Sequence, residues 1–577
     1  MQNNGWALIA AAFLLMTTVA FAVPKKLIEY GWDVPTPSFV AQHIREMEER
    51  PFDGLIMRVP NIGSVFENRK WDRAEVAGEL AALAAIRWEK FTDNFICMYA
   101  ASSMDWCRDA DWENVLHNVG LCAEAARLGR CRGVCFDAEP YGENPWYYPK
   151  QAHAGEKSFA DYCTVVRRRG AQFMARIQEE LPSPVVHTFF LLSLFGDDQD
   201  LADNQYGLLP SFLNGMLDAA TPGTIITDGN ESSYYYTDGI QYVKARRAIL
   251  RAGRGPLVAA GNRGKYRAQL QCSQALYVDH LFDMRTQKNI SAYMTPEQRA
   301  RWFEHNVFWA LTTSDRYVWL YSEKMSWWKN EGLPPGLEQA VISARAKVAA
   351  GKPLGFDLAP IIRRTREQEA AALASGLQRR RAQVPMLAAG VAPVIDGRLE
   401  DPAWGQAAAL EPFVAPFSSP ADSVTTRTTA WLAYDRQCLY VAVRCQEPAM
   451  DKLRLVGTKR DQQVWLGDSV DVFVGPGPGK PYYHLIFNPA NVAWDARCDR
   501  DEDLAWNPRY RSATFRGPDY WTLELALPWS ALKLQARPGT TLVGNLCRQR
   551  GSGELSTWSQ TVSMFVEPEH FGAWELR

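Results

Sequence analysis

The sequence predicts a multidomain chain, a (β/α)8 barrel of the TIM type followed by an all-β sandwich. With 577 residues the chain is too long for one hydrophobic core. Apolar strand-like runs alternate with amphipathic helical patterns up to residue 323. After residue 389 the strands are short and separated by turns rich in Gly, Pro and Asp. The expected parts are a signal peptide at 1–22, a barrel at 23–338, a charged helical linker at 339–388 and a sandwich at 389–577.

The first 22 residues have the pattern of a secretory signal peptide. An apolar run, Ala7–Met16, precedes Ala20-Phe21-Ala22, which is a small-x-small cleavage pattern. The run is shorter than the roughly 20 apolar residues of a membrane-spanning helix. We therefore expect a secreted or periplasmic protein with no stable membrane span after cleavage. An uncleaved anchor is the alternative, because no Lys or Arg precedes the run.

Composition and missing motifs exclude several classes of function. The net charge of -2 argues against a nucleic-acid partner, because phosphate binding needs a basic surface. The sequence contains no Walker loop, no Rossmann glycine fingerprint and no Gly-x-Ser-x-Gly elbow. The 11 Cys and 8 His do not form a zinc-type motif. No cofactor or metal is therefore expected, although calcium in the sandwich is left open.

Eight apolar strand-like runs define the predicted barrel. They are Leu27–Asp33, Gly54–Val59, Asn94–Ala100, Gly133–Glu139, Val185–Leu194, Gly223–Glu231, Ala275–Leu281 and Arg316–Glu323. Continuous apolar strands that alternate with helices indicate a parallel sheet covered on both faces, and eight such units in roughly 300 residues fit a (β/α)8 barrel. The seventh run is the least certain, because residues 240–275 could hold a different element.

Acidic residues recur where these strands end, which is the edge of such a barrel that carries functional groups. They are Asp33, Asp137, Glu139, Asp228, Glu231, Asp279 and Glu323. Cleavage of a glycosidic bond needs one carboxylic acid to protonate the leaving oxygen and a second carboxylate to attack the sugar or activate water. Two carboxyls whose environments separate their pKa values suit that chemistry.

The acids receive distinct expected roles. Glu139 is the expected general acid/base, Asp137 tunes it or binds a hydroxyl, and Glu323 is nucleophile or base with Glu231 as the other candidate partner. Trp32, Trp106, Tyr141 and Tyr321 are expected to contact sugar rings, and Asp33 and Asp228 their hydroxyls. The alternative is structural, because acids at strand ends also cap helices or pair with Arg.

The barrel region resembles the barrels of retaining glycoside hydrolases, which carry an acid/base at the fourth strand. Those enzymes often have Asn-Glu there, whereas this chain has Ala138-Glu139. Their nucleophile usually ends the seventh strand, and the best candidate here, Glu323, ends the eighth.

An ordered set of motifs in the last 185 residues or so resembles the family 9 carbohydrate-binding module. The motifs are Ile395-Asp396-Gly397, Asp401-Pro402-Ala403-Trp404, Arg460-Asp461, Asp468–Phe473, Trp521–Trp529, Trp558-Ser559 and Phe571-Gly572. The resemblance implies sugar binding by aromatic side chains, with Trp465, Trp494 and Trp558 as candidate platforms. Arg460 and Asp468 are candidates to bond hydroxyls. Alternatively, the Trp residues pack the sandwich and Arg460–Asp468 is a structural pair.

Together these observations favour an exported glycoside hydrolase that acts on a polysaccharide or oligosaccharide and carries a binding module. A non-catalytic glycan-binding protein with a degenerate barrel is the second hypothesis, and a surface adhesion module that keeps its anchor is the third. The sequence does not indicate which sugar or linkage is involved.

Overall fold

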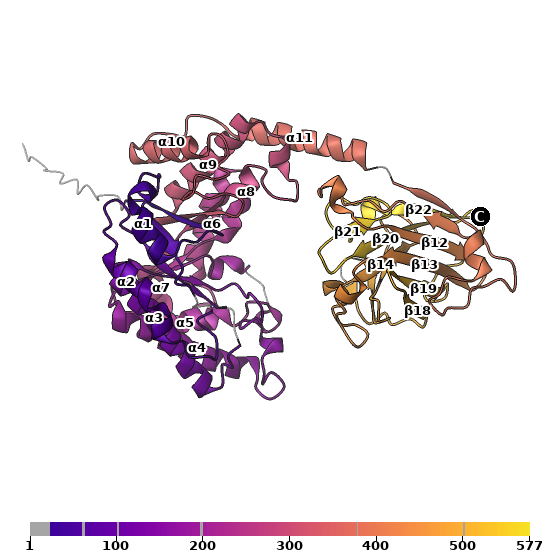
Figure 1. Ribbon diagram of the computed structural model, residues 1–577, viewed down its shortest axis with the longest axis horizontal. Coiled ribbons are helices and arrows are strands. Elements are labelled where there is room, and N and C mark those ends of the chain that lie inside the picture. Colours follow the sequence, from indigo (N-terminus) through magenta and orange to yellow (C-terminus); the bar gives the residue numbers. More distant parts are fainter. Residues whose placement is uncertain (1–23, 61–63, 101–102, 197–199, 378, 500–501) are drawn as a thin grey trace, which may run out of the picture. The chain divides into compact units, whose positions relative to one another are not determined.

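The computed structural model describes residues 24–60, 64–100, 103–196, 200–377, 379–499 and 502–577 (Figure 1). The predicted signal peptide lies outside these residues and stays a prediction. Two compact units are present: 1–284 with 295–359, and 285–294 with 360–577. In the part of the chain described, no helix is long and apolar enough to cross a membrane.

The first unit contains a sheet of nine strands that are all parallel, in the order β7-β6-β5-β4-β3-β2-β1-β9-β8. The strands are β1 (Lys26–Gly31), β2 (Gly54–Met57), β3 (Phe95–Tyr99), β4 (Gly133–Asp137), β5 (Val185–Thr188), β6 (Ile225–Asp228), β7 (Leu270–Cys272), β8 (Gln274–Tyr277) and β9 (Tyr317–Ser322). This nearly closed parallel barrel confirms the predicted fold class for the N-terminal part.

The seventh position of the barrel is occupied by two short strands instead of one. β7 pairs with β6, and β8 pairs with β9, with only Ser273 between them. The predicted strand at 275–281 was therefore placed too late, since residues Val278–Leu281 form a helical turn, α8. One segment therefore contacts both neighbours, and β7 and β8 form the two ends of the nearly closed sheet.

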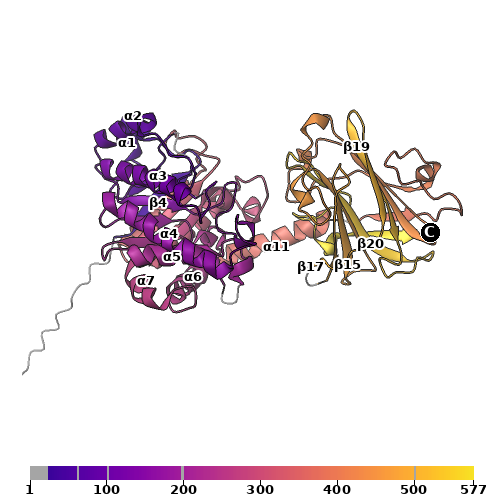
Figure 2. The ribbon, with the colours of Figure 1, turned by 90° about the horizontal axis from the view of Figure 1, so that it is seen from below.

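Helices cover the outside of this sheet (Figure 2). They are α1 (Pro37–Met47), α2 (Ala77–Ala85), α3 (Asp109–Leu128), α4 (Phe159–Glu180), α5 (Leu209–Ala219), α6 (Gly239–Ala252), α7 (Arg263–Gln269), α8 and α9 (Pro296–Thr313). Local sequence sets several of their starts. Ser158 and Thr295 form capping boxes at the starts of α4 and α9, which satisfies free N–H groups there.

The predicted helical linker contains α10 (Leu337–Ala349) and α11 (Ala359–Gly376). α10 packs against α9, where Lys347 donates to Glu304 at 2.6 Å. α11 falls in the second compact unit from Pro360 onward. The boundaries of a linker remain a prediction.

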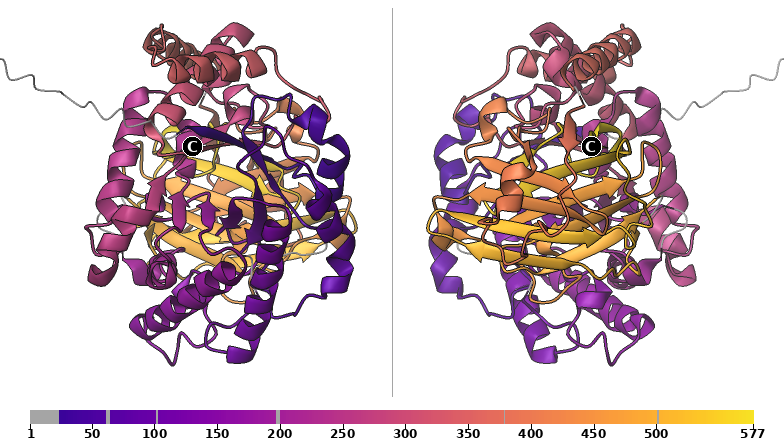
Figure 3. Two further views of the ribbon diagram at one scale, coloured as in Figure 1. Left: turned by 90° about the vertical axis from the view of Figure 1, so that its left-hand side faces the viewer. Right: turned by 90° about the vertical axis from the view of Figure 1, so that its right-hand side faces the viewer.

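The second unit is a two-sheet β-structure, as expected for a sandwich (Figure 3). The larger sheet has the order β10-β22-β20-β14-β15-β16-β17, with β21 also paired to β20, and the smaller has the order β11-β12-β13-β19-β18. Their bounds are β10 (Arg381–Val384), β11 (Ala408–Leu410), β12 (Thr428–Tyr434), β13 (Cys438–Gln446), β14 (Ser469–Gly475), β15 (Tyr482–Phe487), β16 (Ala493–Cys498), β17 (Glu502–Asp503), β18 (Arg511–Arg516), β19 (Tyr520–Pro528), β20 (Thr541–Gln549), β21 (Leu555–Thr557) and β22 (Gly572–Leu576).

A buried carboxylate on β19 explains why two of the sequence motifs occur together. Glu524 is fully buried and accepts hydrogen bonds from the backbone N–H groups of Asp396 (2.9 Å) and Gly397 (2.7 Å). Its other oxygen accepts the indole N–H of Trp404 at 2.7 Å. The carboxylate therefore joins the first segment of the sandwich to the smaller sheet.

We expect Glu524→Gln to lower the free energy of unfolding of the sandwich by about 1–3 kcal/mol, because the amide NH2 would face an N–H donor that has lost its acceptor. Calorimetry of the full chain measures the change. Glu400→Gln, at an exposed position, is the matched control, and an equal effect of both changes would contradict the role of Glu524.

Candidate functional site

The end of β4 carries two acids that share one tyrosine. The hydroxyl of Tyr141 lies 2.6 Å from Glu139 Oε2 and 3.1 Å from Asp137 Oδ2. Asp137 is fully buried, and its other oxygen accepts the backbone N–H of Glu139. Burial, with a further contribution from the charges of Glu139 and Glu231, raises the pKa of Asp137 to about 8. A protonated Asp137 can donate to the Tyr141 oxygen while Tyr141 donates to Glu139.

Glu231 belongs to the same electrostatic cluster. It starts a short 3-10 segment after β6, directly after Asn230, which has a left-handed backbone (φ 44°) and donates to Gln274 at 2.7 Å. Burial and the negative charge of Glu139 raise the pKa of Glu231 to about 7. The predicted pair on β4 and the predicted acid after β6 therefore face one region.

Glu323 is held by a second group of side chains at the ends of β8 and β9. Tyr277 donates to Glu323 Oε1 at 2.8 Å, and Tyr321 lies 3.3 Å from the same oxygen. Asp279 accepts the backbone N–H groups of Glu323 and Lys324, both at 2.8 Å. Asp279 thus fixes the loop, and the two tyrosines orient the Glu323 carboxylate.

Aromatic rings connect the two carboxylate groups. Tyr234 stacks on Tyr321 with ring centroids 5.8 Å apart, and Tyr30 stacks on Tyr321 at 5.6 Å. The pKa of Tyr30 is raised by burial and also by nearby groups that include Asp137. The pKa of Tyr234 is raised by burial and by Glu231. These buried rings lower the local dielectric, so that a charge placed beside them costs free energy.

Three of the predicted substrate contacts make hydrogen bonds within the protein. Asp228 is fully buried and accepts the backbone N–H groups of Leu191 and Ser193, so it fixes the loop after β5. Trp106 is 0% exposed and packs on Trp112 and other rings of the core. Its indole N–H donates to the carbonyl of Pro145. Asp33 accepts the hydroxyl of Ser326.

The other three predicted aromatic contacts have exposed surface. Trp32 is 69% exposed with Lys324 5.5 Å from its ring centroid, and Tyr141 is 54% exposed. Tyr321 is half-buried beside Glu323. These rings can lie against a ligand that reaches the acids.

Sequence reasoning missed three groups near this edge. Tyr277 donates a hydrogen bond to Glu323. The pKa of Tyr206 is raised by burial and by the charges of Glu139 and Glu231. Glu29 is fully buried. The pKa of Glu29 is raised well above its usual value by burial and by Asp33. Glu29 was detectable in the sequence, because an acid stands inside the otherwise uncharged run LIEYG.

The candidate tryptophans of the sandwich divide into two sets. Trp558 is buried in the core between the sheets. Trp494 and the half-buried Trp465 pack edge to face, with centroids 5.5 Å apart, in a separate cluster. Trp558 therefore packs the sandwich, whereas Trp465 retains surface that a ligand can contact.

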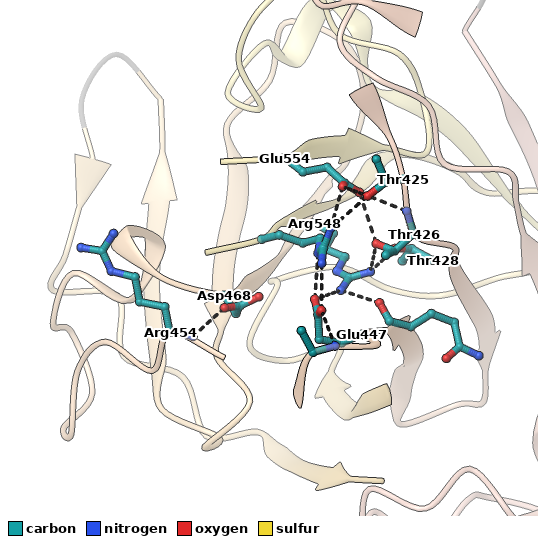
Figure 4. Close-up of polar contacts among 11 residues, drawn as sticks. Thr425, Thr426, Thr428, Glu447, Arg454, Asp468, Arg548 and Glu554 are labelled. Atoms are coloured by element: carbon teal, nitrogen blue, oxygen red, sulfur yellow. Dashed lines mark hydrogen bonds and ion pairs between the residues drawn. The ribbon is translucent and has the colours of Figure 1, made fainter. Parts of the chain in front are cut away.

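Arg460 and Asp468 do not pair with each other. Arg460 forms a bidentate bond with the buried Asp495, at 2.8 and 2.7 Å. Asp468 accepts the backbone N–H of Arg454 at 2.8 Å (Figure 4). Figure 4 also shows the buried Arg548 bonded to Thr426, Thr428 and Glu447, at 3.1–3.3 Å. These contacts hold the strands and loops of the sandwich together.

Residues 395–577 match the family model described as "Carbohydrate family 9 binding domain-like". The C-terminal part of the chain therefore contains a domain of this type. This confirms the resemblance found in the sequence. No curated protein matches the chain.

Several solved structures are similar to the chain, among them the following three. A family 9 carbohydrate-binding module from Caldicellulosiruptor kristjanssonii, in complex with cellotriose, is 18% identical, with 34% of this chain and 94% of that chain covered and a TM-score of 0.27. A glycoside hydrolase family 5 enzyme from Prevotella bryantii, with a xyloglucan tetradecasaccharide, is 9% identical over 55% of this chain and 95% of that chain, with a TM-score of 0.33. A glucosidase from Croceicoccus marinus is 9% identical over 88% and 96%, with a TM-score of 0.30. These TM-scores are below 0.5, so the fold assignment rests on strand order and the family model.

Asp137 should make the stability of the barrel depend on pH. Its folded-state pKa of about 8 lies above its ordinary value of 3.8, so the folded state holds the proton more tightly. Stability from this group is full below about pH 4 and is lost as the pH rises through 8, by on the order of 1 kcal/mol per unit. We expect Asp137→Asn to flatten the decline in melting temperature between pH 5 and 9. Parallel curves for wild type, Asp137→Asn and the exposed control Glu143→Gln would contradict this role.

Proposed function

We propose that the protein is an exported glycoside hydrolase that acts on a polysaccharide or oligosaccharide, with its chemistry at the carboxylates of the barrel edge. The observation that carries the proposal is the Glu139–Glu231 pair. One member is a carboxyl whose pKa of about 7 keeps a proton available near neutral pH, and the other is a carboxylate stabilised by Tyr141. Glycosidic cleavage needs these two states side by side.

The raised pKa of Glu231 favours this residue as the proton donor. The charge of Glu139 helps to keep Glu231 protonated, so Glu231 can give its proton to the leaving oxygen. Glu139 then supplies the carboxylate that attacks the anomeric carbon or activates water. This reverses the role that the sequence suggested for Glu139, and it makes Glu231 a stronger candidate than Glu323.

Asp137 and Tyr141 act on the charge of Glu139. Tyr141 donates to the Glu139 carboxylate at 2.6 Å, and a neutral Asp137 supports Tyr141 without adding a second negative charge. Glu323, which is bonded by Tyr277 and Tyr321, would accept hydroxyls of a neighbouring sugar ring. Trp32 would give that ring an aromatic face.

The C-terminal domain would hold the enzyme on its substrate. A binding module linked to a catalytic domain raises the local concentration of substrate without any new chemistry. The family model for residues 395–577 supports sugar as the ligand of this domain.

We expect Glu231→Gln to lower kcat/KM on unactivated oligosaccharides by about 10²–10⁴-fold, because the leaving oxygen loses its acid. The same variant should retain most activity on aryl glycosides with acidic phenol leaving groups, which need no proton. Glu139→Gln should lose activity on both substrates. Glu143→Gln, exposed on the same loop, is the matched control.

Wild-type kcat/KM should fall above about pH 7 as Glu231 loses its proton.

A broad panel of plant, algal and host glycans provides the measurement, with reducing-sugar release as readout. No turnover on any glycan, with measurable binding by the full chain, would favour the alternative of a glycan-binding protein with a degenerate barrel. Loss of aryl glycoside activity in Glu231→Gln would contradict its role as proton donor.

We expect Trp465→Ala to weaken retention of the full chain on the polysaccharide by at least about 10-fold, because an aromatic side chain at the centre of a binding site contributes strongly to binding. Affinity electrophoresis measures this directly. Leu466→Ala, at the adjacent exposed residue, is the control, and equal retention of both variants would argue against Trp465 as the platform.

A further inference from the structure

Three side chains with metal-binding chemistry converge on one face of the larger sheet. One ring nitrogen of His484, Sγ of Cys498 and a carboxylate oxygen of Glu502 all lie within 4.8 Å of one another. The register of the strands brings these three side chains together. Cys498 is opposite both Tyr482 on β15 and Glu502 on β17, and His484 is two residues from Tyr482 on the same face.

The convergence lies outside the core between the two sheets. Alternate residues of β15, such as Tyr483 and Leu485, pack in that core. Tyr482 and Cys498 belong to the cluster on the opposite face. The site is therefore separate from the packing that holds the sandwich together.

His484 is already oriented as a ligand. Its Nε2 lies 2.8 Å from Asp471 Oδ2, and this side chain is only 3% exposed. Its Nδ1 is buried and has no hydrogen-bond partner. A carboxylate that accepts one ring N–H leaves a lone pair on the other nitrogen, as in metal sites where an acid fixes the histidine tautomer. A buried acceptor without a partner requires an explanation, and a bound cation supplies one.

The surroundings favour ion binding. Phe473 stacks on the imidazole at 4.1 Å and Trp494 contacts its edge at 5.1 Å, so two sides of the ring exclude water. Glu502 is exposed and leaves a route from solvent. A low dielectric strengthens attraction between a cation and the ligands that hold it.

We propose that His484, Cys498 and Glu502 bind a borderline-soft divalent cation of the Zn²⁺ class. Nitrogen, sulfur and carboxylate oxygen are the ligands that Zn²⁺ takes in proteins, whereas Ca²⁺ and Mg²⁺ take oxygen ligands. Water completes four-fold coordination. When the metal–sulfur bond forms, Cys498 releases its thiol proton to solvent.

Such an ion would attach the edge strand β17 to β15 and β16. β17 has only two residues and pairs with β16 alone. Three ligands from three consecutive strands would fix this edge, next to Trp494 and its partner Trp465. The metal would therefore order the same face that carries the candidate sugar platform.

The test uses Co²⁺ as a spectroscopic probe on the full, chelator-treated chain. Wild type should show a thiolate-to-cobalt charge-transfer band that saturates at one equivalent and disappears when Zn²⁺ is added. Cys498→Ser should lose the band. Cys438→Ser, which changes a half-buried thiol on β13 of the smaller sheet, is the matched control and should keep it.

Glu502→Gln provides a second variant, because an exposed side chain can be changed without loss of the fold. Zn²⁺ affinity, measured by competition with a chromophoric chelator, should fall by about 10-fold or more. The proposal would be overturned by absence of the band in wild type, by its persistence in Cys498→Ser, or by unchanged affinity in Glu502→Gln.

Discussion

Burial of carboxyl groups at one end of a parallel sheet is the constraint on which this barrel depends. Parallel strands bring their C-terminal ends to one edge, so acids that follow different strands are forced together. Like charges in an apolar setting cannot all ionise, and the pKa values of Asp137 and Glu231 rise to about 8 and 7. The fold stores electrostatic free energy there, and a site that must move protons can use it.

Two kinds of acid occur at this edge, and their partners distinguish them. Asp228 and Asp279 accept backbone N–H groups, so their charges stabilise loops. Glu139 and Glu323 accept tyrosine hydroxyls, which can move when a ligand arrives. A carboxylate fixed by the backbone has little freedom to react, whereas one held by side-chain hydroxyls remains available. This difference separates the structural acids from the candidate catalytic ones more clearly than their position in sequence.

Periodicity predicted most of the fold, because apolar strands alternate with helices along the whole barrel. It failed at the seventh strand, where Ser273 divides one bent segment and a helical turn follows. Strand-end position also predicted where acids gather, but not which residues are buried: Trp32 is exposed and Trp106 is enclosed. Arg460 pairs with Asp495, 35 residues away, and not with the nearby Asp468. Such partners depend on strand register, which local sequence does not encode.

The two faces of the larger sandwich sheet differ in the side chains that they bury. Its inner face packs apolar side chains against the smaller sheet. The outer face mixes rings with buried polar groups, including the Asp471–His484 pair and the Trp465–Trp494 contact. Burying polar groups outside a core costs free energy unless they have partners. Asp471 and His484 are partners of each other, and Nδ1 of His484 is the buried atom of this pair left without one, which the proposed cation would bond.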